Sequence, residues 1–459
     1  MKKDIFRVFS SNLIKMLVTV ITVFVIPMVL TVDDYGYYKT FTFYASYVGV
    51  THLGFCDGIY LKYGGKRLEE IDRSAVQGEW SSLLIYELLI SLATLFFGLI
   101  RQDLIITFLG LIVIPDVVFT FYTYIYQSTG EFVKYTRIMN ISTLLNLILN
   151  VALVLTKQTD YRLYVGAYVL MKICSFTVGS IFCGHDDLLH FSGVSGNTLI
   201  MYIKLGILLM VGNFAYTLFI GLDKWFIKFN MDISQFSMYS FASQMLTVVN
   251  MFVTPISMTL YSYISRRKDK NFETRIKKML VCFLMIFPLA IYALSFIIKQ
   301  FMKQYIPAID VVSILLITQI FLSINMAVFV NLYKAYQKQN EYFIRLLAAL
   351  ATAFVLDLLV TVIRPDIKYY AFATLVSCIV WMLLNMKYYN HLIPKLSELV
   401  YVVALLGIYL FSLLIDNIFI RSGIYVIALF TLTYLLMNDE WKYFIKQFIG
   451  IKNKLSRIR

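Results

Sequence analysis

Charged side chains are scarce in this sequence of 459 residues, and their scarcity excludes most soluble folds. Asp, Glu, Lys and Arg together make up 15% of the chain, whereas they make up about 25% of a typical soluble domain. Hydrophobic residues make up 60%, and the mean hydropathy is +0.75. The apolar residues come in blocks of about 20, the length that a helix needs to cross a bilayer. We therefore predict an all-α, polytopic integral membrane protein without a sizeable soluble domain.

Cysteine is also rare, and its positions exclude two further classes of protein. There is no CxxC pair and no disulfide-like spacing among the five cysteines, which are Cys56, Cys174, Cys183, Cys282 and Cys378. One short stretch holds four candidate metal ligands, namely His185, Asp186, Asp187 and His190. It has no matching ligands elsewhere in the sequence, so a solvated loop is favoured over a metal site. We predict neither a metal nor a cofactor.

The net charge of +14 does not indicate nucleic-acid binding, because the basic residues flank apolar blocks. Such clusters set the orientation of membrane helices. The chain starts with MKKDIFR and an apolar run to about Leu30, and it lacks the small-residue cleavage site of a signal peptide. We expect this first span to be retained, and we expect no nucleic acid as a partner.

Fourteen membrane spans are predicted from the apolar blocks, with an error of a few residues at each end. The first six lie near 9–31, 38–60, 79–100, 104–126, 136–156 and 161–183. The next six lie near 203–227, 236–263, 277–298, 309–333, 343–363 and 370–389. Two more follow near 399–415 and 423–441. The even number of spans places both termini on the same side of the membrane.

The distribution of Lys and Arg over alternating loops predicts the orientation. The side that holds both termini carries 28 of these residues, and the opposite side carries 11. The N- and C-termini are therefore predicted to lie in the cytoplasm. Every loop on the outer side is short, so we place the function within the bilayer.

Two similar turns indicate an internal duplication. The stretch DDYGYYKTFTFYAS is followed about 200 residues later by SQFSMYSFASQM, so that Tyr38 aligns with Tyr239. Aromatic belts, which mark any outer membrane interface, are the alternative explanation. Six spans separate the turns, so two lobes would share one orientation. The predicted organisation is an N-terminal six-helix lobe over 1–184, a cytoplasmic loop over 185–202, a C-terminal six-helix lobe over 203–396, and two further helices with a basic tail over 397–459.

Two lysines lie inside predicted spans, where an ionisable group costs about 2.5–3.5 kcal/mol at the bilayer centre. Lys172 lies midway along span 6, too deep to reach the headgroups, whereas Lys15 lies near the start of span 1 and is able to extend toward them. We interpret Lys172 as lining a polar cavity. The alternative is a structural ion pair of Lys172 with Glu87 or Asp116.

Three acids lie near the middle of spans: Glu87 in span 3, Asp116 in span 4 and Asp357 in span 11. In the functional interpretation, a buried lysine binds a phosphate of the ligand. One of the acids then exchanges protons or sodium ions as the cavity opens. The sequence does not choose which acid pairs with the lysine.

Two further charged motifs lie near the ends of spans. Asp223 and Lys224, in GLDKWFI, lie near the outer end of span 7, where an interfacial cap is the alternative interpretation. Asp57 and Gly58, in GFCDGIYLKYGGK, are placed at the cytoplasmic end of span 2. The GGK string lacks the spacing of a phosphate-binding loop, so we exclude that role.

Several short motifs resemble a known family when taken together. They are VDDYGYY after a proline-bearing first helix, DGIYLKYGGK at the end of span 2, and the Asp-Lys step of span 7 before a Tyr-Ser-Phe-Ala helix. With the six-plus-six-plus-two arrangement of spans, they resemble Wzx-type polysaccharide repeat-unit flippases. These belong to the multidrug/oligosaccharidyl-lipid/polysaccharide exporter superfamily. The resemblance covers nearly the whole chain, and each motif alone is short.

The resemblance implies two six-helix lobes around a central cavity. Such a flippase moves an undecaprenyl-diphosphate-linked oligosaccharide, such as an O-antigen or capsule unit, across the bacterial cytoplasmic membrane by alternating access. The candidate substrate-binding residues are Lys172, Lys15 and Lys224. The candidate ion-coupling residues are Glu87, Asp116 and Asp357. The implied partners are the membrane lipid, a proton or sodium counter-ion, and a polysaccharide polymerase.

The family often has Asp-Arg at the span 7 step, so Lys224 lacks the bidentate phosphate geometry of arginine. The resemblance also gives three motif residues without a chemical role, namely Asp57, Gly58 and Asp223.

An integral-membrane glycosyltransferase is the main alternative from another class, because Asp33 and Asp34 resemble its acidic pair. The turn that holds them is too short to admit an acceptor and a metal. A repeat-unit polymerase is disfavoured because there is no large outer loop. We therefore predict no enzyme, and we retain a lipid II or multidrug exporter of the same superfamily as the alternative function.

Overall fold

The computed structural model describes residues 18–19, 22–267, 269–439 and 442, and every regular element within them is a helix. The all-α prediction is confirmed for this part of the chain. About half of the first predicted span, including Lys15, lies outside the described residues, and residues 22–29 are helical. The chain divides into two compact units, Met1–Thr217 and Leu218–Arg459.

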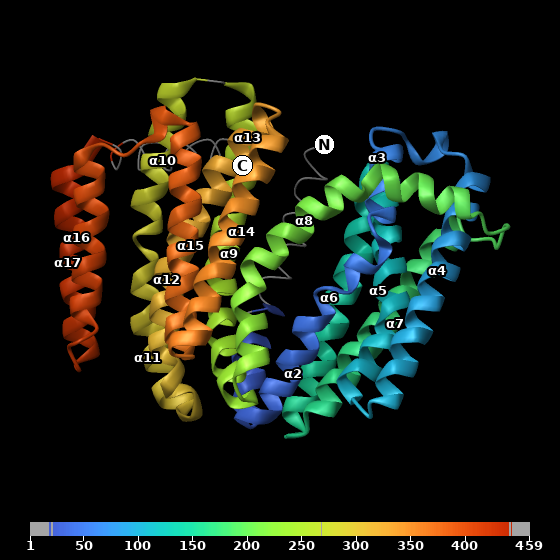
Figure 1. Cartoon of the computed structure of the whole chain (residues 1–459), viewed down its shortest axis with the longest axis horizontal. Coiled ribbons are helices and arrows are strands. Elements are labelled where there is room, and N and C mark those ends of the chain that lie inside the picture. Colours follow the sequence, from blue (N-terminus) through green and yellow to red (C-terminus); the bar gives the residue numbers. More distant parts are fainter. Residues whose placement is uncertain (1–17, 20–21, 268, 440–441, 443–459) are drawn as a thin grey trace, which may run out of the picture. The chain divides into compact units, whose positions relative to one another are not determined.

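Eleven described helical segments are long and apolar enough to cross a membrane, which agrees with a multi-pass membrane protein. The first unit contains α4 (Arg73–Ile100), α5 (Leu104–Ser128), α6 (Phe132–Leu155) and α7 (Tyr161–His185), and α8 (Gly196–Asn230) contains the border between the units (Figure 1). The second unit contains α9 (Ile233–Arg266), α14 (Gln339–Ile363), α15 (Ile367–Tyr388) and α17 (Ile418–Leu436). The total of fourteen spans stays a prediction.

Two of these eleven segments are interrupted helices of the second unit. The first, Lys270–Phe301, consists of α10 (Lys270–Leu284), η3 (Phe287–Leu289) and α11 (Ala290–Phe301). The second, Lys303–Ala335, consists of η4 (Lys303–Ala308), α12 (Ile309–Ile324), the π-helical η5 (Asn325–Val330) and α13 (Asn331–Ala335). The shorter α16 (Leu396–Ser412) corresponds to the thirteenth predicted span.

The second predicted span, 38–60, is not one continuous helix. It is divided into α2 (Val32–Ala45), η1 (Val48–His52) and α3 (Phe55–Tyr63). The chain turns at Leu53 and Gly54, which have φ angles of 47° and 89°. Glycine adopts this left-handed conformation without steric penalty, and the helix is interrupted there. Asp57 and Gly58 therefore lie at the start of α3, directly after the break.

The predicted cytoplasmic loop 185–202 is also shorter than expected. Helix α7 ends at His185 and α8 begins at Gly196, so residues 196–202 are helical. Two serines of α4 hold the connection in place. Ser81 Oγ accepts the Ser192 backbone N–H at 3.1 Å, and Ser82 Oγ accepts the Ser195 N–H at 3.1 Å.

Six aspartates, one threonine and one asparagine serve as helix N-caps. A side-chain oxygen that accepts a backbone N–H of the first turn satisfies a donor that has no partner within the helix. Such caps are made by Thr31, Asp72, Asp103, Asp160, Asp232, Asp269, Asp366 and Asn417. These aspartates thus define where the helices start, and they are separate from the acids within the spans.

Helices α4 and α5 form a tightly packed hairpin because glycines face the partner helix. A Cβ on Gly98 would lie 2.6 Å from the Thr107 nitrogen, and one on Gly110 would lie 2.7 Å from the Leu95 nitrogen. The Ser91 hydroxyl donates to the Gly110 carbonyl at 2.7 Å across the same interface. Helix α5 also packs against α2, α3 and α7, so it is the central helix of the first unit.

The segment Lys303–Ala335 is the most enclosed span of the second unit, with 89% of its most apolar window buried. Its amide side chains bind neighbouring helices. Gln319 Nε2 donates to Asn250 Oδ1 at 2.6 Å, and Asn325 Oδ1 accepts from Asn385 Nδ2 at 3.0 Å. The sequence analysis missed this buried polar network, which fixes the π-helical turn against α15.

Helix α16 is attached to α10 by a buried ion pair. Lys277 Nζ lies 2.8 Å from Glu398 Oε1, and it also donates to the Leu392 carbonyl at 2.7 Å. The exposed fractions of the two side chains are 1% and 4%. Lys277 lies within α10 and is buried.

Several pairs of helices start at a sequence offset similar to that of the expected duplication. Helix α2 begins at Val32 and α9 at Ile233, 201 residues later. Helices α6 and α14 start 207 residues apart, and α7 and α15 start 206 residues apart. Tyr38 and Tyr239, which the sequence aligned, are both buried. The lobe boundaries at 184 and 203 stay a prediction.

The N-terminal half of α8 crosses α3 at backbone contact distance. A Cβ on Gly206 would lie 2.0 Å from the Gly54 carbonyl oxygen, and one on Gly58 would lie 2.3 Å from the Tyr202 carbonyl oxygen. Gly58 is therefore a packing residue, which gives this motif position a structural role.

We expect Gly206→Ala to lower the free energy of unfolding by about 1–3 kcal/mol, because the added methyl group has no space between two backbones. Gly166→Ala is the matched control, since a Cβ there meets nothing within 4 Å. The control should be neutral or stabilising by up to about 1 kcal/mol, because alanine favours the helix. Thermal unfolding of the purified protein in detergent measures both, and equal transition temperatures would contradict the close crossing.

Candidate functional site

Lys172 on α7 forms an ion pair with Asp116 on α5, midway along both helices. The exposed fraction of each side chain is 18%, and Lys172 Nζ also lies 5.5 Å from the centroid of the Tyr168 ring. Of the two acids that the sequence offered as structural partners, Asp116 is the one that binds the lysine. A charge-assisted hydrogen bond of this kind offsets the loss of hydration that both groups incur.

A second polar group surrounds the break between η1 and α3. His52 is 5% exposed and Asp57 is 4% exposed. The His52 Nδ1 accepts the Gly54 backbone N–H at 3.0 Å, so Nε2 carries the proton of the neutral ring. That nitrogen lies 4.0 Å from Asp57 Oδ2. The left-handed glycine therefore both bends the chain and sets the tautomer of the histidine.

Glu87 of α4 contacts the same broken segment from the side. Its Oε2 accepts the Thr51 hydroxyl at 2.9 Å, and the neighbouring Tyr86 hydroxyl donates to the Thr51 carbonyl at 3.1 Å. The other carboxylate oxygen of Glu87 is buried and has no hydrogen-bond partner among the described residues. A buried carboxylate with an unpaired oxygen is stable when it holds a proton or a cation.

A cleft of about 160 Å³ opens beside the break in the first unit. Its wall consists of Ser46, Tyr47, Gly49, Val50, His52, Asp57, Tyr124, Met210, Asn213, Phe214 and Thr217. Of these residues, the sequence singled out only Asp57. His52 was missed because one histidine in an apolar block has little effect on hydropathy. The helix-breaking Leu-Gly pair that follows it was the available signal.

The candidate residues of the second unit gather around Asp223 of α8. Its Oδ2 accepts the hydroxyl of Tyr239 and, at 2.8 Å, the hydroxyl of Thr374. Its Oδ1 accepts the backbone N–H of Lys224 at 2.7 Å. Four helices, α8, α9, α14 and α15, contribute to this group once Asp357 is included.

Asp357 is 2% exposed and lies close enough to Asp223 for the two carboxyl groups to interact electrostatically. Its Oδ1 is buried without a hydrogen-bond partner among the described residues. The hydroxyls of Thr361 and Tyr370, which are 2.7 Å apart, belong to the same region. The structure thus brings together Asp223, Asp357 and Tyr239, which the sequence identified for separate reasons.

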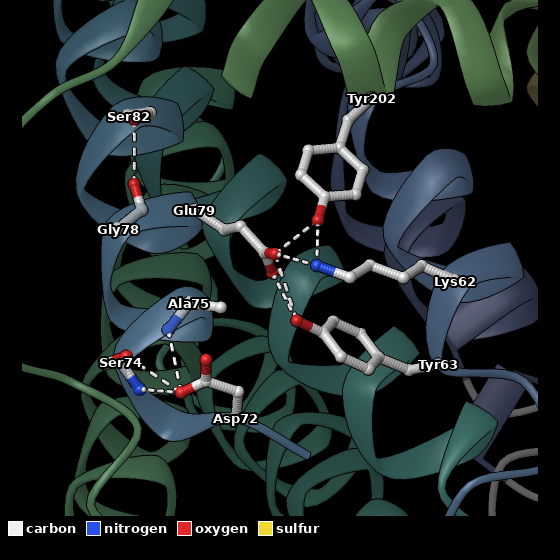
Figure 2. A network of polar contacts seen from close by, with 9 residues as sticks. All are labelled: Lys62, Tyr63, Asp72, Ser74, Ala75, Gly78, Glu79, Ser82 and Tyr202. Carbon is white, nitrogen blue, oxygen red and sulfur yellow. Dashed lines mark hydrogen bonds and ion pairs between the residues drawn. The ribbon is translucent and has the colours of Figure 1, made fainter. Parts of the chain in front are cut away.

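Figure 2 shows a polar network around Glu79, which joins three helices near the end of α3. Lys62 Nζ lies 2.7 Å from Glu79 Oε1, the Tyr202 hydroxyl donates to the same oxygen at 2.5 Å, and the Tyr63 hydroxyl lies 3.0 Å from both oxygens. Glu79 is 2% exposed and fully hydrogen-bonded. This network ties α3, α4 and α8 together, and we assign it a structural role.

The connection that was weighed as a metal site is occupied by other interactions. Asp186 binds Lys134 at 2.5 Å and accepts the Tyr126 hydroxyl at 2.8 Å, while Asp187 lies 3.1 Å from His190. Within the described residues, no group of three or more His, Cys, Asp or Glu side chains is placed to hold a metal.

The acidic pair that suggested a glycosyltransferase stabilises the start of a helix. The Asp34 carboxylate accepts the Thr31 hydroxyl at 2.5 Å, and the Thr31 oxygen accepts the Asp34 backbone N–H at 3.1 Å. The other carboxylate oxygen of Asp34 lies 3.5 Å from the Tyr161 nitrogen at the start of α7. Asp34 therefore has a capping role that accounts for its position.

We expect Lys172→Gln and Asp116→Asn each to lower the free energy of unfolding by on the order of 3 kcal/mol, because each leaves an unpaired charge in an apolar region. The double variant should recover most of the loss, which a double-mutant cycle measures. Lys368 and Asp310 form the control pair, since their side chains are 46% and 64% exposed. Their coupling should stay below about 1 kcal/mol. Additive losses at Lys172 and Asp116 would contradict the ion pair.

Comparison with known proteins supports the fold and leaves the family open. No protein-family model matches the chain, and no curated protein matches it. A solved structure described as "Lipid II flippase MurJ, inward closed conformation" is similar, with a TM-score of 0.71 and 16% identity. The match covers 96% of this chain and 99% of that one.

A second structure, an inward-facing multidrug resistance MATE family transporter of the MOP superfamily, matches with a TM-score of 0.53 and 11% identity. That match covers 83% of this chain and 98% of the other. At such identities the likeness establishes a shared fold. The chain therefore has the helical fold found in these two transporters.

Proposed function

We propose that this protein is a flippase that moves undecaprenyl-diphosphate-linked oligosaccharide units across the bacterial cytoplasmic membrane by alternating access. The observation that carries the proposal is the extent of the shared fold, since the structure of a lipid II flippase aligns over 96% of this chain. That neighbour is described as a lipid II flippase. We propose a lipid-linked substrate for this chain as well, because its buried charged groups suit an anionic headgroup.

The Lys172–Asp116 pair supplies the chemistry for an anionic headgroup. A diphosphate that approaches Lys172 competes with Asp116 for the same ammonium group, and it offers more negative charge. Substrate binding would therefore replace one ion pair by another, and Asp116 would be left to take up a cation. A lysine that is already paired in the resting protein avoids an uncompensated charge within the bilayer.

Ion coupling is assigned to the buried carboxylates Asp223, Asp357 and Glu87. Asp223 and Asp357 are both buried in the second unit, and burial disfavours the charged form of a carboxylate unless the group holds a proton or a cation. Oxygen ligands suit a hard cation, and the hydroxyls of Tyr239 and Thr374 already point at Asp223. Glu87 is the corresponding candidate in the first unit. Sodium and the proton are both compatible with this set of groups.

The remaining predictions from the sequence are part of this proposal. Lys15 and Lys224 are further candidates for the headgroup, both termini are predicted to lie in the cytoplasm, and a polysaccharide polymerase is the candidate partner. The second candidate function is export of lipid II or of a multidrug substrate, which the described functions of the two structural neighbours favour. Fold and mechanism would be common to both candidates.

A transport assay in proteoliposomes tests the proposal. Fluorescent lipid-linked oligosaccharide placed in one leaflet should appear in the other when the protein is present, and lipid II and a hydrophobic cation serve as competing substrates. Movement of the oligosaccharide lipid under an applied sodium or proton gradient supports the proposal. Movement of the hydrophobic cation alone would assign the multidrug function instead.

We expect Asp357→Asn to reduce gradient-driven transport about tenfold or more, because an amide neither binds a proton at neutral pH nor neutralises a cation. Asp310→Asn is the matched control, since Asp310 is exposed and pairs with Lys368 at the surface. The control should transport as the unchanged protein does. Full gradient dependence in Asp357→Asn would remove this residue from the coupling mechanism.

A further inference from the structure

We infer that the cleft beside the break between η1 and α3 binds one uncharged sugar residue of the lipid-linked substrate. This inference rests on the proposed function and adds a second subsite, separate from the charged pair. The volume of the cleft is about 160 Å³. A cleft of this size admits a single sugar ring and is too small for a whole oligosaccharide. All of its lining residues belong to the first unit.

The apolar part of the wall suits the C–H faces of a pyranose. Three aromatic rings, those of Tyr47, Tyr124 and Phe214, line the cleft from three elements. The rings of Tyr47 and Phe214 meet edge to face, with their centroids 6.2 Å apart and an interplanar angle of 80°. Rings held against one another in this way present fixed surfaces, and an aromatic surface contributes contact area at low conformational entropy.

The polar part of the wall suits hydroxyl groups. Asp57 is a carboxylate that accepts hydrogen bonds, and the His52 Nε2 donates one because its other nitrogen accepts from Gly54. The Asn213 amide both donates and accepts. A sugar hydroxyl also donates and accepts, so it would bridge the 4.0 Å gap that separates His52 Nε2 from Asp57 Oδ2. Both of these side chains are at least nine-tenths buried, so their positions are fixed before the ligand arrives.

The charge of the wall separates this subsite from the phosphate site. Among the described residues, no lysine or arginine lines the cleft, so this wall offers no countercharge to a diphosphate. The candidate for the diphosphate in the described part of the first unit is the Lys172–Asp116 pair. Asp116 and Tyr124 lie eight residues apart on α5, which corresponds to about 12 Å along the helix. One helix would therefore present a phosphate site and a sugar site at a spacing that a sugar diphosphate is able to span.

The test measures binding of small sugars to the full chain in lipid nanodiscs by saturation-transfer NMR. The probes are methyl glycosides of neutral and N-acetylated hexoses, with inorganic pyrophosphate as the charged probe. Asp57→Asn removes the carboxylate and keeps the shape of the side chain, and Asn213→Leu removes the amide. Asn197→Leu is the matched control, because Asn197 is an exposed asparagine on the same helix, outside the cleft.

We expect at least one glycoside to bind, and we expect Asp57→Asn and Asn213→Leu to weaken its binding about tenfold or more, since each removes a hydrogen bond to the sugar. Binding of pyrophosphate should be unchanged in both variants and reduced in Lys172→Gln. Thermal unfolding of each variant confirms that it is folded, and Asn213→Leu decides the question if Asp57→Asn is unstable.

The outcomes separate this inference from the proposed function. The sugar subsite is overturned if the protein transports lipid-linked oligosaccharide but binds no glycoside in the cleft. It is also overturned if Asn213→Leu and Asn197→Leu bind the glycoside equally well. In both cases the proposed flippase function is retained. If a hydrophobic cation saturates the cleft and no glycoside competes with it, the inference is overturned in favour of a drug site. Absence of any lipid-linked transport would overturn the proposed function instead.

Discussion

The pairing of ionisable groups within apolar helices is the constraint on which the rest of the structure depends. Each charge in a span is stable only with a partner, a proton or access to water. Lys172 meets this condition through Asp116, and Lys277 meets it through Glu398. Glu87 and Asp357 meet it only in part, since each keeps one buried carboxylate oxygen without a hydrogen bond from the described residues. That contrast divides the buried charges into those that are paired in this structure and those that are candidate carriers of an ion.

The break at Gly54 links packing to the candidate site. The left-handed turn lets α8 approach α3 at Gly206 and Gly58, and the same turn directs a backbone N–H to His52. Polar groups that a continuous helix would have dispersed are therefore gathered beside one cleft. Interruptions of this kind tend to line cavities in membrane proteins, because unpaired backbone groups are tolerated only where protein or water covers them.

Much of the architecture was predictable from the sequence, and the failures have physical causes. Apolar blocks of about 20 residues identify spans because the bilayer sets their length. The ion pair of Lys172 was considered only as the alternative to a polar cavity. Hydropathy did not detect the break at Gly54, since the flanking residues are apolar on both sides. It also concealed Gln319 and Asn325, whose amides lie within a strongly apolar segment. The burial of Lys277 was not predictable, because a buried lysine and a solvated one look alike in a basic cluster.

The amide network of α12 and η5 has a consequence for the order of assembly during synthesis. Asn325 is translated 60 residues before Asn385, which donates to it in the finished protein. At about 5–20 residues per second, the earlier amide waits on the order of 3–12 s for that partner to emerge from the ribosome. During this interval its polar group has to be shielded from the acyl chains by earlier helices or by the insertion machinery. The enclosed segment is therefore expected to settle only after α15 has entered the membrane.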